Sequence, residues 1–298
     1  MELRQNKVKE ARTTCEPFTK DAAFAKNKHR KLGLYYHGLA CFLDKDYTNA
    51  GRSLNQVAPF TDPAFGIHAE YLVGRVMHLG GEQAEASVHY DAVLANYTRA
   101  RKDATEALKQ PDRFKTNPFE KARLESLTKS PSPEYIAGAA FHGACLNYEA
   151  GKFPEALAKF QTFLKDSSQS PLAPDAALRA GFCLVQLKQF DEATKLLAPI
   201  PDKTPRLADQ ALFWLGKAQL GLATLVDPAN TTDRDNKLKA AIATLKSATD
   251  KANQLTSATS RLSFRVEPLQ FDPRFVDGEL PIDRSLILVD ASRPRGNF

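Results

Sequence analysis

The chain has 298 residues, of which 43% are hydrophobic and 26% charged, and its formal net charge is +6. This size and composition are typical of a globular protein with a sizeable core. The sequence contains no apolar run of about eighteen residues, so we expect no transmembrane segment. Residues 1–31 carry nine Lys/Arg against four Asp/Glu. They lack the dense basic clusters with interleaved aromatics typical of nucleic-acid binding, so we expect no nucleic-acid partner.

Residues 1–30 are expected to form a partial repeat. The segment VKEARTTCEPF matches the second helix of the repeat described below, with Ala11 at its alanine position. We therefore expect the array to begin within a repeat. The first residues, MELRQNKVKEAR, are charged and show no apolar stretch of the kind found in secretory signals.

Residues 31–95 contain two units of one pattern. A small residue, Gly38 or Gly74, is followed twelve residues later by Ala50 or Ala86. The small residue returns at three later places: Ala144, Gly181 and Gly216. A period of about 35 residues with apolar residues at helical spacing predicts stacked helical hairpins. Small residues suit positions where two antiparallel helices approach closely.

Residues 96–134 depart from this pattern. The segment DAVLANYTRARKDATEALKQ predicts that the preceding helix continues for a long distance. After Pro111 the chain is polar, with a short helix expected at FEKARLESL. Two interpretations stay open for this region, an insertion or a degenerate repeat.

Residues 135–256 return to the repeat pattern. Gly151 interrupts the apolar stripe where a helix should end, and Pro154 fits the first turn of the next helix. After Gly216 a longer loop, VDPANTTDRDN, precedes the helix KLKAAIATLKSATDKA. Residues 257–298 are expected to form an irregular tail, interpreted as the truncated start of another domain, in which SLILVD has strand-like composition.

The pattern resembles the tetratricopeptide repeat (TPR) family. The resemblance is carried by small first-helix residues, a glycine and an aromatic at the turn, and an alanine and an aromatic on the second helix, as in Gly151, Phe153, Ala156 and Phe160. It covers residues 30–95 and 134–225. It implies an all-α fold, a right-handed α-α superhelix (TPR-like solenoid), followed by the irregular tail.

A finer resemblance concerns the segment KFQTFLKDSSQSPLAPDAALRAGFCLVQLKQFDEATKLL. This segment is similar to the bacterial periplasmic branch of TPR proteins that includes TolA-binding and outer-membrane-assembly lipoproteins. The absence of a signal indicates the cytoplasm, whereas this resemblance indicates the periplasm or envelope if the N-terminus is truncated. The sequence leaves the compartment open.

No motif for covalent chemistry is present. The six histidines form neither H-E-x-x-H nor a cysteine–histidine metal pattern, and no nucleophile motif occurs. Cys41, Cys145 and Cys183 fall at packed positions of the repeats, which favours core packing over metal binding or disulfides. We therefore expect no enzyme, no catalytic residue, no metal and no cofactor.

The resemblance implies that the first helix of each hairpin lines the inner wall of the array. Amphipathic or charged residues on this face are candidates for contacting a partner, because such side chains give contact area and hydrogen bonds. The candidates are Tyr35, Tyr71, Arg75, His78, Tyr148 and Lys217. The alternative is that most of these side chains pack against the adjoining helix.

The predicted function is a non-enzymatic scaffold or adaptor that binds a peptide or protein segment in the concave groove. The alternative is a structural spacer of a larger multidomain or envelope-associated protein whose missing part carries the activity. Unpaired terminal helices would then favour self-association.

Overall fold

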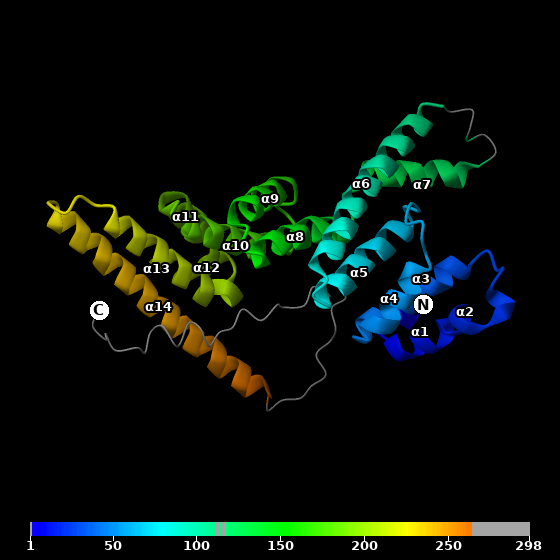
Figure 1. Cartoon of the computed structure of the whole chain (residues 1–298), viewed down its shortest axis with the longest axis horizontal. Coiled ribbons are helices and arrows are strands. Elements are labelled where there is room, and N and C mark those ends of the chain that lie inside the picture. Colours follow the sequence, from blue (N-terminus) through cyan, green and yellow to red (C-terminus); the bar gives the residue numbers. More distant parts are fainter. Residues whose placement is uncertain (1, 111–113, 115–116, 264–298) are drawn as a thin grey trace. The chain divides into compact units, whose positions relative to one another are not determined.

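The computed structural model describes residues 2–110, 114 and 117–263, and Figure 1 shows their order along the chain. Within these residues every regular element is a helix. The all-α fold expected from the sequence is confirmed. The chain divides into two compact units, Met1–Leu146 and Asn147–Phe298.

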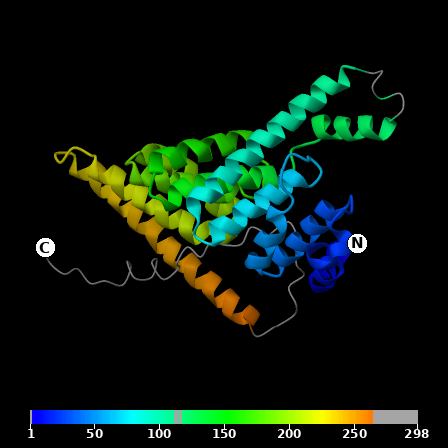
Figure 2. The ribbon, with the colours of Figure 1, turned by 45° about the vertical axis from the view of Figure 1, so that its right-hand side comes forward.

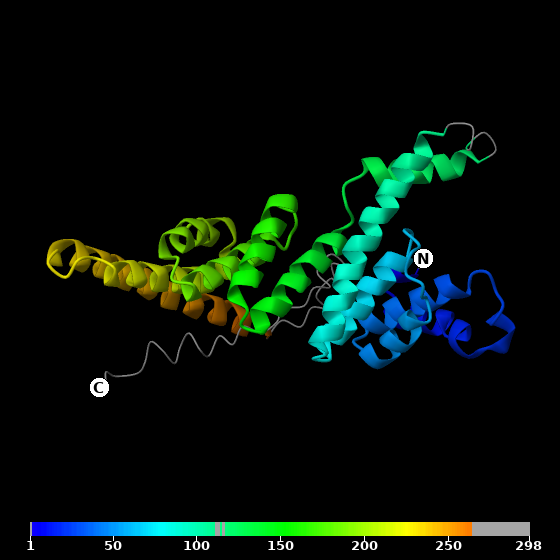
Figure 3. The same ribbon diagram turned by 45° about the horizontal axis from the view of Figure 1, so that its top comes forward.

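Unit 1 consists of helical hairpins preceded by short helices. Its helices are α1 (Val8–Cys15), α2 (Pro17–Lys20), α3 (Arg30–Leu43), α4 (Tyr47–Asn55), α5 (Gly66–Leu79), α6 (Gln83–Leu108), α7 (Pro118–Lys129) and most of α8 (Glu134–Glu149). Two short 3₁₀ turns, Glu2–Gln5 and Ala22–Phe24, flank α1 and α2. Helix α3 pairs with α4 and α5 pairs with α6, as the blue and cyan ribbons of Figure 3 show. Helix α1 packs on α3, with Ala11 buried.

Unit 2 continues the hairpin pattern. Its helices after the end of α8 are α9 (Phe153–Asp166), α10 (Ala173–Gln186), α11 (Phe190–Leu197), α12 (Ile200–Lys203), α13 (Ala208–Thr224) and α14 (Thr231–Ser263), with a 3₁₀ turn at Pro205–Leu207. Helix α10 contacts α9, α11 and α13. Helices α13 and α14 form a long antiparallel pair, drawn in yellow and orange in Figure 2.

The hairpin turns share one backbone geometry. Seven residues after each small residue (45 − 38 = 7 in the first unit), φ is positive: 63° at Lys45, 84° at Gly81, 69° at Gly151 and 60° at Lys188. The second helix begins two residues later, at Tyr47, Gln83, Phe153 and Phe190. Glycine adopts this left-handed conformation freely, whereas lysine does so at a cost. The helix break expected at Gly151 is confirmed.

The small residues allow close helix approach, as the sequence predicts. A Cβ atom on Gly38 would lie 2.5 Å from Cγ of Leu54, and one on Gly74 would lie 3.0 Å from Cε1 of Tyr90. The alanines of the repeat are all 0% exposed: Ala50, Ala86, Ala156 and Ala193. A larger side chain at these places would force the two helices apart.

The last hairpin keeps this contact with a different spacing. A Cβ atom on Gly216 would lie 2.6 Å from Cγ of Leu245 and 3.5 Å from the carbonyl oxygen of Ala241. Ala241, which is 1% exposed, therefore takes the alanine position 25 residues after the small residue (241 − 216 = 25). The spacing is longer because the α13–α14 loop replaces the short turn.

Residues 96–134 contain two helical segments, and α14 ends later than the sequence predicts. The long helix and the short helix expected within residues 96–134 are present as α6 and α7, which contact each other. The tail was expected from residue 257, but α14 continues to Ser263. This boundary is corrected because no glycine or proline interrupts the helix before Pro268. The remaining tail, including SLILVD, lies outside the described residues.

Candidate partner-binding surface

Unit 2 carries a row of aromatic side chains along its first helices. The aromatic row consists of Tyr148 at the end of α8, Phe153 at the start of α9, Phe182 on α10, and Phe213 and Trp214 on α13. All five side chains are partly exposed. Large aromatics that keep partial exposure on three successive first helices offer contact area for a partner.

The rings of the aromatic row touch one another edge to face. The ring centroids of Tyr148 and Phe182 are 5.1 Å apart, and those of Phe182 and Trp214 are 4.5 Å apart with an interplanar angle of 90°. Phe153 and Phe213 extend the contacts, at 5.5 Å from Phe182 and 5.0 Å from Trp214. Edge-to-face pairs at these distances are mutually attractive, so the row is held in a defined shape.

Two cations lie against rings of the aromatic row. The Arg179 guanidinium carbon is 5.2 Å from the centroid of the Tyr148 ring, and Nζ of Lys217 is 5.4 Å from that of Phe213. Both distances fall within the range of cation–π attraction. The row therefore combines apolar rings with positive charge, the mixture that is typical of interface hot spots.

The repeat geometry explains why these residues come together. Tyr148 lies four residues after Ala144, Phe182 one residue after Gly181, and Trp214 two residues before Gly216, positions that fall within about 120° around their helices. Beneath them, Ala180, Cys183 and Ala218 are 0% exposed and fill the core of the unit. The small core residues set the helix spacing that aligns the rings.

Two of the six candidates from the sequence, Tyr148 and Lys217, belong to this surface. The other four are in unit 1, where the structure buries them: Tyr35 is 9% exposed, Tyr71 5%, Arg75 4% and His78 8%. Their role in partner binding stays a prediction.

The four unit 1 candidates take part in internal contacts among α3, α5, α6 and α8. The Tyr35 hydroxyl lies 2.8 Å from Nδ1 of His68, and Nδ1 of His78 lies 3.1 Å from the Tyr90 hydroxyl. Tyr71 fits against Gly138 of α8, where a Cβ atom would lie 2.7 Å from the tyrosine hydroxyl oxygen.

Arg75 contributes the remaining contact of this group. Its Nη1 donates to Nδ1 of His142 over 3.1 Å, a contact that requires an unprotonated Nδ1 because arginine can only donate. In these contacts the four side chains hold helices of unit 1 together.

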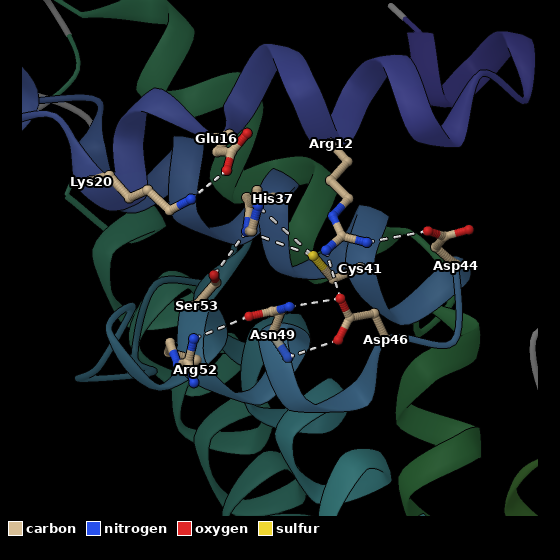
Figure 4. Close-up of polar contacts among 10 residues, drawn as sticks. All are labelled: Arg12, Glu16, Lys20, His37, Cys41, Asp44, Asp46, Asn49, Arg52 and Ser53. Atoms are coloured by element: carbon tan, nitrogen blue, oxygen red, sulfur yellow. Dashed lines mark hydrogen bonds and ion pairs between the residues drawn. The ribbon is translucent and has the colours of Figure 1, made fainter.

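A second polar group joins α1 to the first hairpin (Figure 4). Arg12 donates from Nη2 to Oδ2 of Asp46 over 2.6 Å and from Nη1 to Oδ2 of Asp44 over 3.2 Å. Asp46 also accepts from the Asn49 backbone and side chain, as a helix N-cap should. Arg12 therefore fastens α1 to the α3–α4 turn.

The same region contains a cysteine, a histidine and a serine in contact. Sγ of Cys41 lies 3.7 Å from Nδ1 of His37, which lies 2.8 Å from the Ser53 hydroxyl (Figure 4). Burial raises the pKa of the Cys41 thiol to about 11 and lowers the pKa of His37. A thiol with a raised pKa is largely protonated near neutral pH.

The cysteines of the repeats pack in the core, as expected: Cys41, Cys145 and Cys183 are 0% exposed. Within the described part of the chain, no group of three or more His, Cys, Asp or Glu side chains is placed to hold a metal ion. None of the helices described is long and apolar enough to span a membrane.

Trp214 belongs to the aromatic row but is not among the six candidates from the sequence. Those candidates lie three residues before, one after or four after a small residue, whereas Trp214 lies two residues before Gly216. A usable signal was present, since Trp214 is the single tryptophan of the chain and tryptophan is enriched at binding hot spots.

Comparison with known proteins agrees with this architecture. The family model described as tetratricopeptide repeat matches residues 147–220, which include the whole aromatic row. No curated protein matches the sequence.

Three solved structures are similar to this chain at low sequence identity. MamA from AMB-1 is 14% identical with a TM-score of 0.49, covering 75% of this chain and 92% of its own. MamA from MSR-1 is 14% identical with a TM-score of 0.48, covering 76% and 99%. The C-terminal part of a TPR repeat-containing protein from Cytophaga hutchinsonii is 13% identical with a TM-score of 0.39, covering 84% and 96%.

The hairpins and the family match define the class: a helical-repeat protein with a TPR-like solenoid fold. Proteins of this class present extended surfaces built from repeated helices and generally serve as protein–protein interaction scaffolds.

Proposed function

We propose that the protein is a scaffold that binds a peptide or protein segment on the aromatic row of unit 2. The observation that carries this proposal is the chain of contacts from Tyr148 through Phe182 to Trp214, which links three successive first helices by partly exposed rings. Such a surface takes an extended or helical segment with apolar side chains. Lys217, which is partly exposed beside the Phe213 ring, favours a segment that also carries carboxylates.

We propose further that the chain is related to the TolA-binding branch of TPR proteins and that it binds its partner in a groove. Binding on apolar rings and a neighbouring cation needs no covalent chemistry. The alternative, a structural spacer, places no demand on these partly exposed side chains.

A displayed library of random peptides tests the proposal. The chain is immobilised and peptides are selected on it, then re-tested on the Phe182→Ala and Lys217→Glu variants. We expect selected peptides rich in apolar and acidic residues, with retention lowered about tenfold or more on either variant, because hot-spot residues dominate binding energy. Lys217→Glu changes a partly exposed charge and is the gentler of the two substitutions.

Tyr36→Ala serves as the matched control, because Tyr36 is an aromatic residue of unit 1 that is 42% exposed. It should retain selected peptides at the level of the unmodified chain. Equal retention on all variants with unchanged circular dichroism would refute binding at the aromatic row and favour the spacer.

A further inference from the structure

We propose that one end of the first hairpin docks on an anionic lipid surface. This basic edge consists of cations at or just before the start of α3 and near the end of α4: Lys26, Lys28, Arg30, Lys31 and Arg52. Four of these side chains are exposed, and that of Arg30 is partly exposed. The edge belongs to unit 1 and the aromatic row to unit 2, so this inference goes beyond the proposed function and does not depend on it.

Antiparallel packing brings the cations of the two helices together. Nη2 of Arg30 donates to Oε1 of Gln56 over 2.9 Å, and Nζ of Lys31 donates to the carbonyl oxygen of Ala58 over 2.6 Å. Gln56 in turn donates from Nε2 to the carbonyl oxygen of Arg52 over 3.1 Å. The start of α3 is therefore fastened to the end of α4, and the five cations share one end of the hairpin.

The loop that precedes α3 is held in a defined shape. The backbone N–H of Asn27 donates to the carbonyl oxygen of Phe24 over 3.0 Å, and the ring centroids of Phe24 and Phe18 are 4.8 Å apart. Phe18 packs so closely on Gly33 of α3 that a Cβ atom there would overlap its ring. The lysines of this loop are therefore presented from a fixed position, which lowers the entropy lost on binding.

Acidic residues are scarce around the basic edge. Residues 22–43 and 47–61 contain no Asp or Glu. The acids that flank these segments at the edge are Asp21 and Asp62, and each carboxylate accepts a hydrogen bond from a backbone N–H two residues later. Five cations against these two acids leave a net charge of 5 − 2 = +3, which favours an anionic partner.

The other acids next to these segments are paired with cations. Glu16 accepts from Lys20 over 2.6 Å, and Asp44 and Asp46 accept from Arg12 (Figure 4). Asp44 also lies beyond the far end of α3, about 21 Å from the start of that helix. These carboxylates therefore do not cancel the charge of the basic edge.

The kind of cation favours a lipid surface over an acidic peptide or a nucleic acid. Arginine binds carboxylate or phosphate through a planar fork, whereas lysine is a hydrated point charge. Arg52 already donates from Nη1 to Oδ1 of Asn49 over 3.2 Å. By contrast, the side chains of Lys26 and Lys28 make no hydrogen bond or ion pair with the described residues. Such point charges suit the diffuse negative surface of anionic headgroups.

Sedimentation with vesicles tests the inference. We expect the full chain to sediment with vesicles of equal parts phosphatidylserine and phosphatidylcholine, and not with vesicles of phosphatidylcholine alone. Binding should be lost at about 1 M salt, where the Debye length falls to about 3 Å. Lys26→Glu/Lys28→Glu should weaken binding about tenfold or more, because each cation near an anionic surface adds to the attraction.

Lys239→Glu/Lys246→Glu is the matched control. Both lysines are exposed on α14 and lie 246 − 239 = 7 residues apart, so they share one face of the helix. The substitutions change the net charge by the same amount as those in the basic edge. This variant should bind anionic vesicles like the unmodified chain, and circular dichroism checks that all three chains are folded.

Three results would overturn the inference. The first is no preference for the anionic vesicles, and the second is equal binding by the two double variants. The third is complete loss of vesicle binding when oligoglutamate or a single-stranded oligonucleotide is added at the same concentration of negative charge as the lipid. The edge would then prefer an acidic protein segment or a nucleic acid. Peptide binding at the aromatic row is tested separately and stands in each of these cases.

Discussion

A Cβ atom on Gly216 of α13 would lie 2.6 Å from Cγ of Leu245 on α14, closer than two carbon atoms normally approach. Gly216→Ala should therefore destabilise the protein by about 1–3 kcal/mol, because the added methyl group forces Leu245 or the helix pair to move. Denaturant unfolding followed by circular dichroism measures this change.

Gly143→Ala is the matched control. Gly143 is also a buried helical glycine, but a Cβ atom there would meet its nearest neighbour, Cβ of Tyr90, at 3.8 Å, an ordinary contact. This substitution should be neutral or stabilise by about 0.5–1 kcal/mol, because alanine favours helices. Equal destabilisation by both substitutions would argue against close helix packing at Gly216.

The shared turn geometry gives a second prediction. Lys188 has a φ of 60° at the position that Gly151 occupies in the preceding hairpin. Lys188→Gly should stabilise the protein by up to about 1 kcal/mol, because glycine removes the cost of the left-handed conformation. Thermal unfolding would show a higher midpoint, and Lys195→Gly, within α11, should lower it instead.

The fold was largely predictable because its determinants are local. The small residue, the left-handed turn and the buried alanine recur at fixed offsets, so one hairpin predicts the next. The twelve-residue offset does not apply to Ala241, because the loop after α13 is longer. The sequence spacing therefore does not show which residue faces Gly216. The end of α14 was misplaced because the helix has no strong stop signal.

The candidate site was only partly predictable because burial depends on neighbours. Helical spacing correctly placed Tyr71 and Arg75 on one face of α5. It could not show that α8 covers this face with Gly138 and His142. By contrast, Tyr148 and Lys217 keep partial exposure. Periodicity identifies a face, and only the three-dimensional packing shows what covers it.

The lowered pKa of the Asp46 carboxylate predicts how acidic pH affects the stability of unit 1. Hydrogen bonding from the Asn49 side chain, followed by backbone bonding and Arg12, lowers its pKa. A lowered carboxylate pKa contributes stability above the unfolded value of about 3.9, and this contribution is lost as pH falls through the folded value. In the Asn49→Ala variant, the free energy of unfolding should therefore fall less between pH 6 and acidic pH than in the unmodified chain. Urea unfolding measures this difference.

Asn55→Ala is the control for this experiment, because Asn55 is exposed at the end of the same helix. It should leave the acid dependence unchanged. The account of Asp46 is wrong if the two variants show the same dependence on pH.

The four cysteines are expected to differ in their reactivity toward thiol reagents. Cys15 is partly exposed, whereas Cys41, Cys145 and Cys183 are 0% exposed. Burial also raises the pKa of Cys41 to about 11 and that of Cys183 to about 12, which suppresses the reactive thiolate. A thiol reagent at neutral pH should modify Cys15 in the native protein and the other three after unfolding.

Cys15→Ser should abolish modification by the thiol reagent in the folded protein. Rapid modification of Cys41 or Cys183 in the folded chain would contradict their place in the core.

The measurement that tests partner binding most directly is the indole N–H resonance of Trp214 during titration with a peptide selected on the chain. As the single tryptophan, it gives one such resonance, and it lies in contact with Phe182. The proposed function predicts a saturable shift of this resonance that Lys217→Glu weakens. A peptide that binds with equal affinity to both chains and leaves the Trp214 resonance unmoved would contradict it.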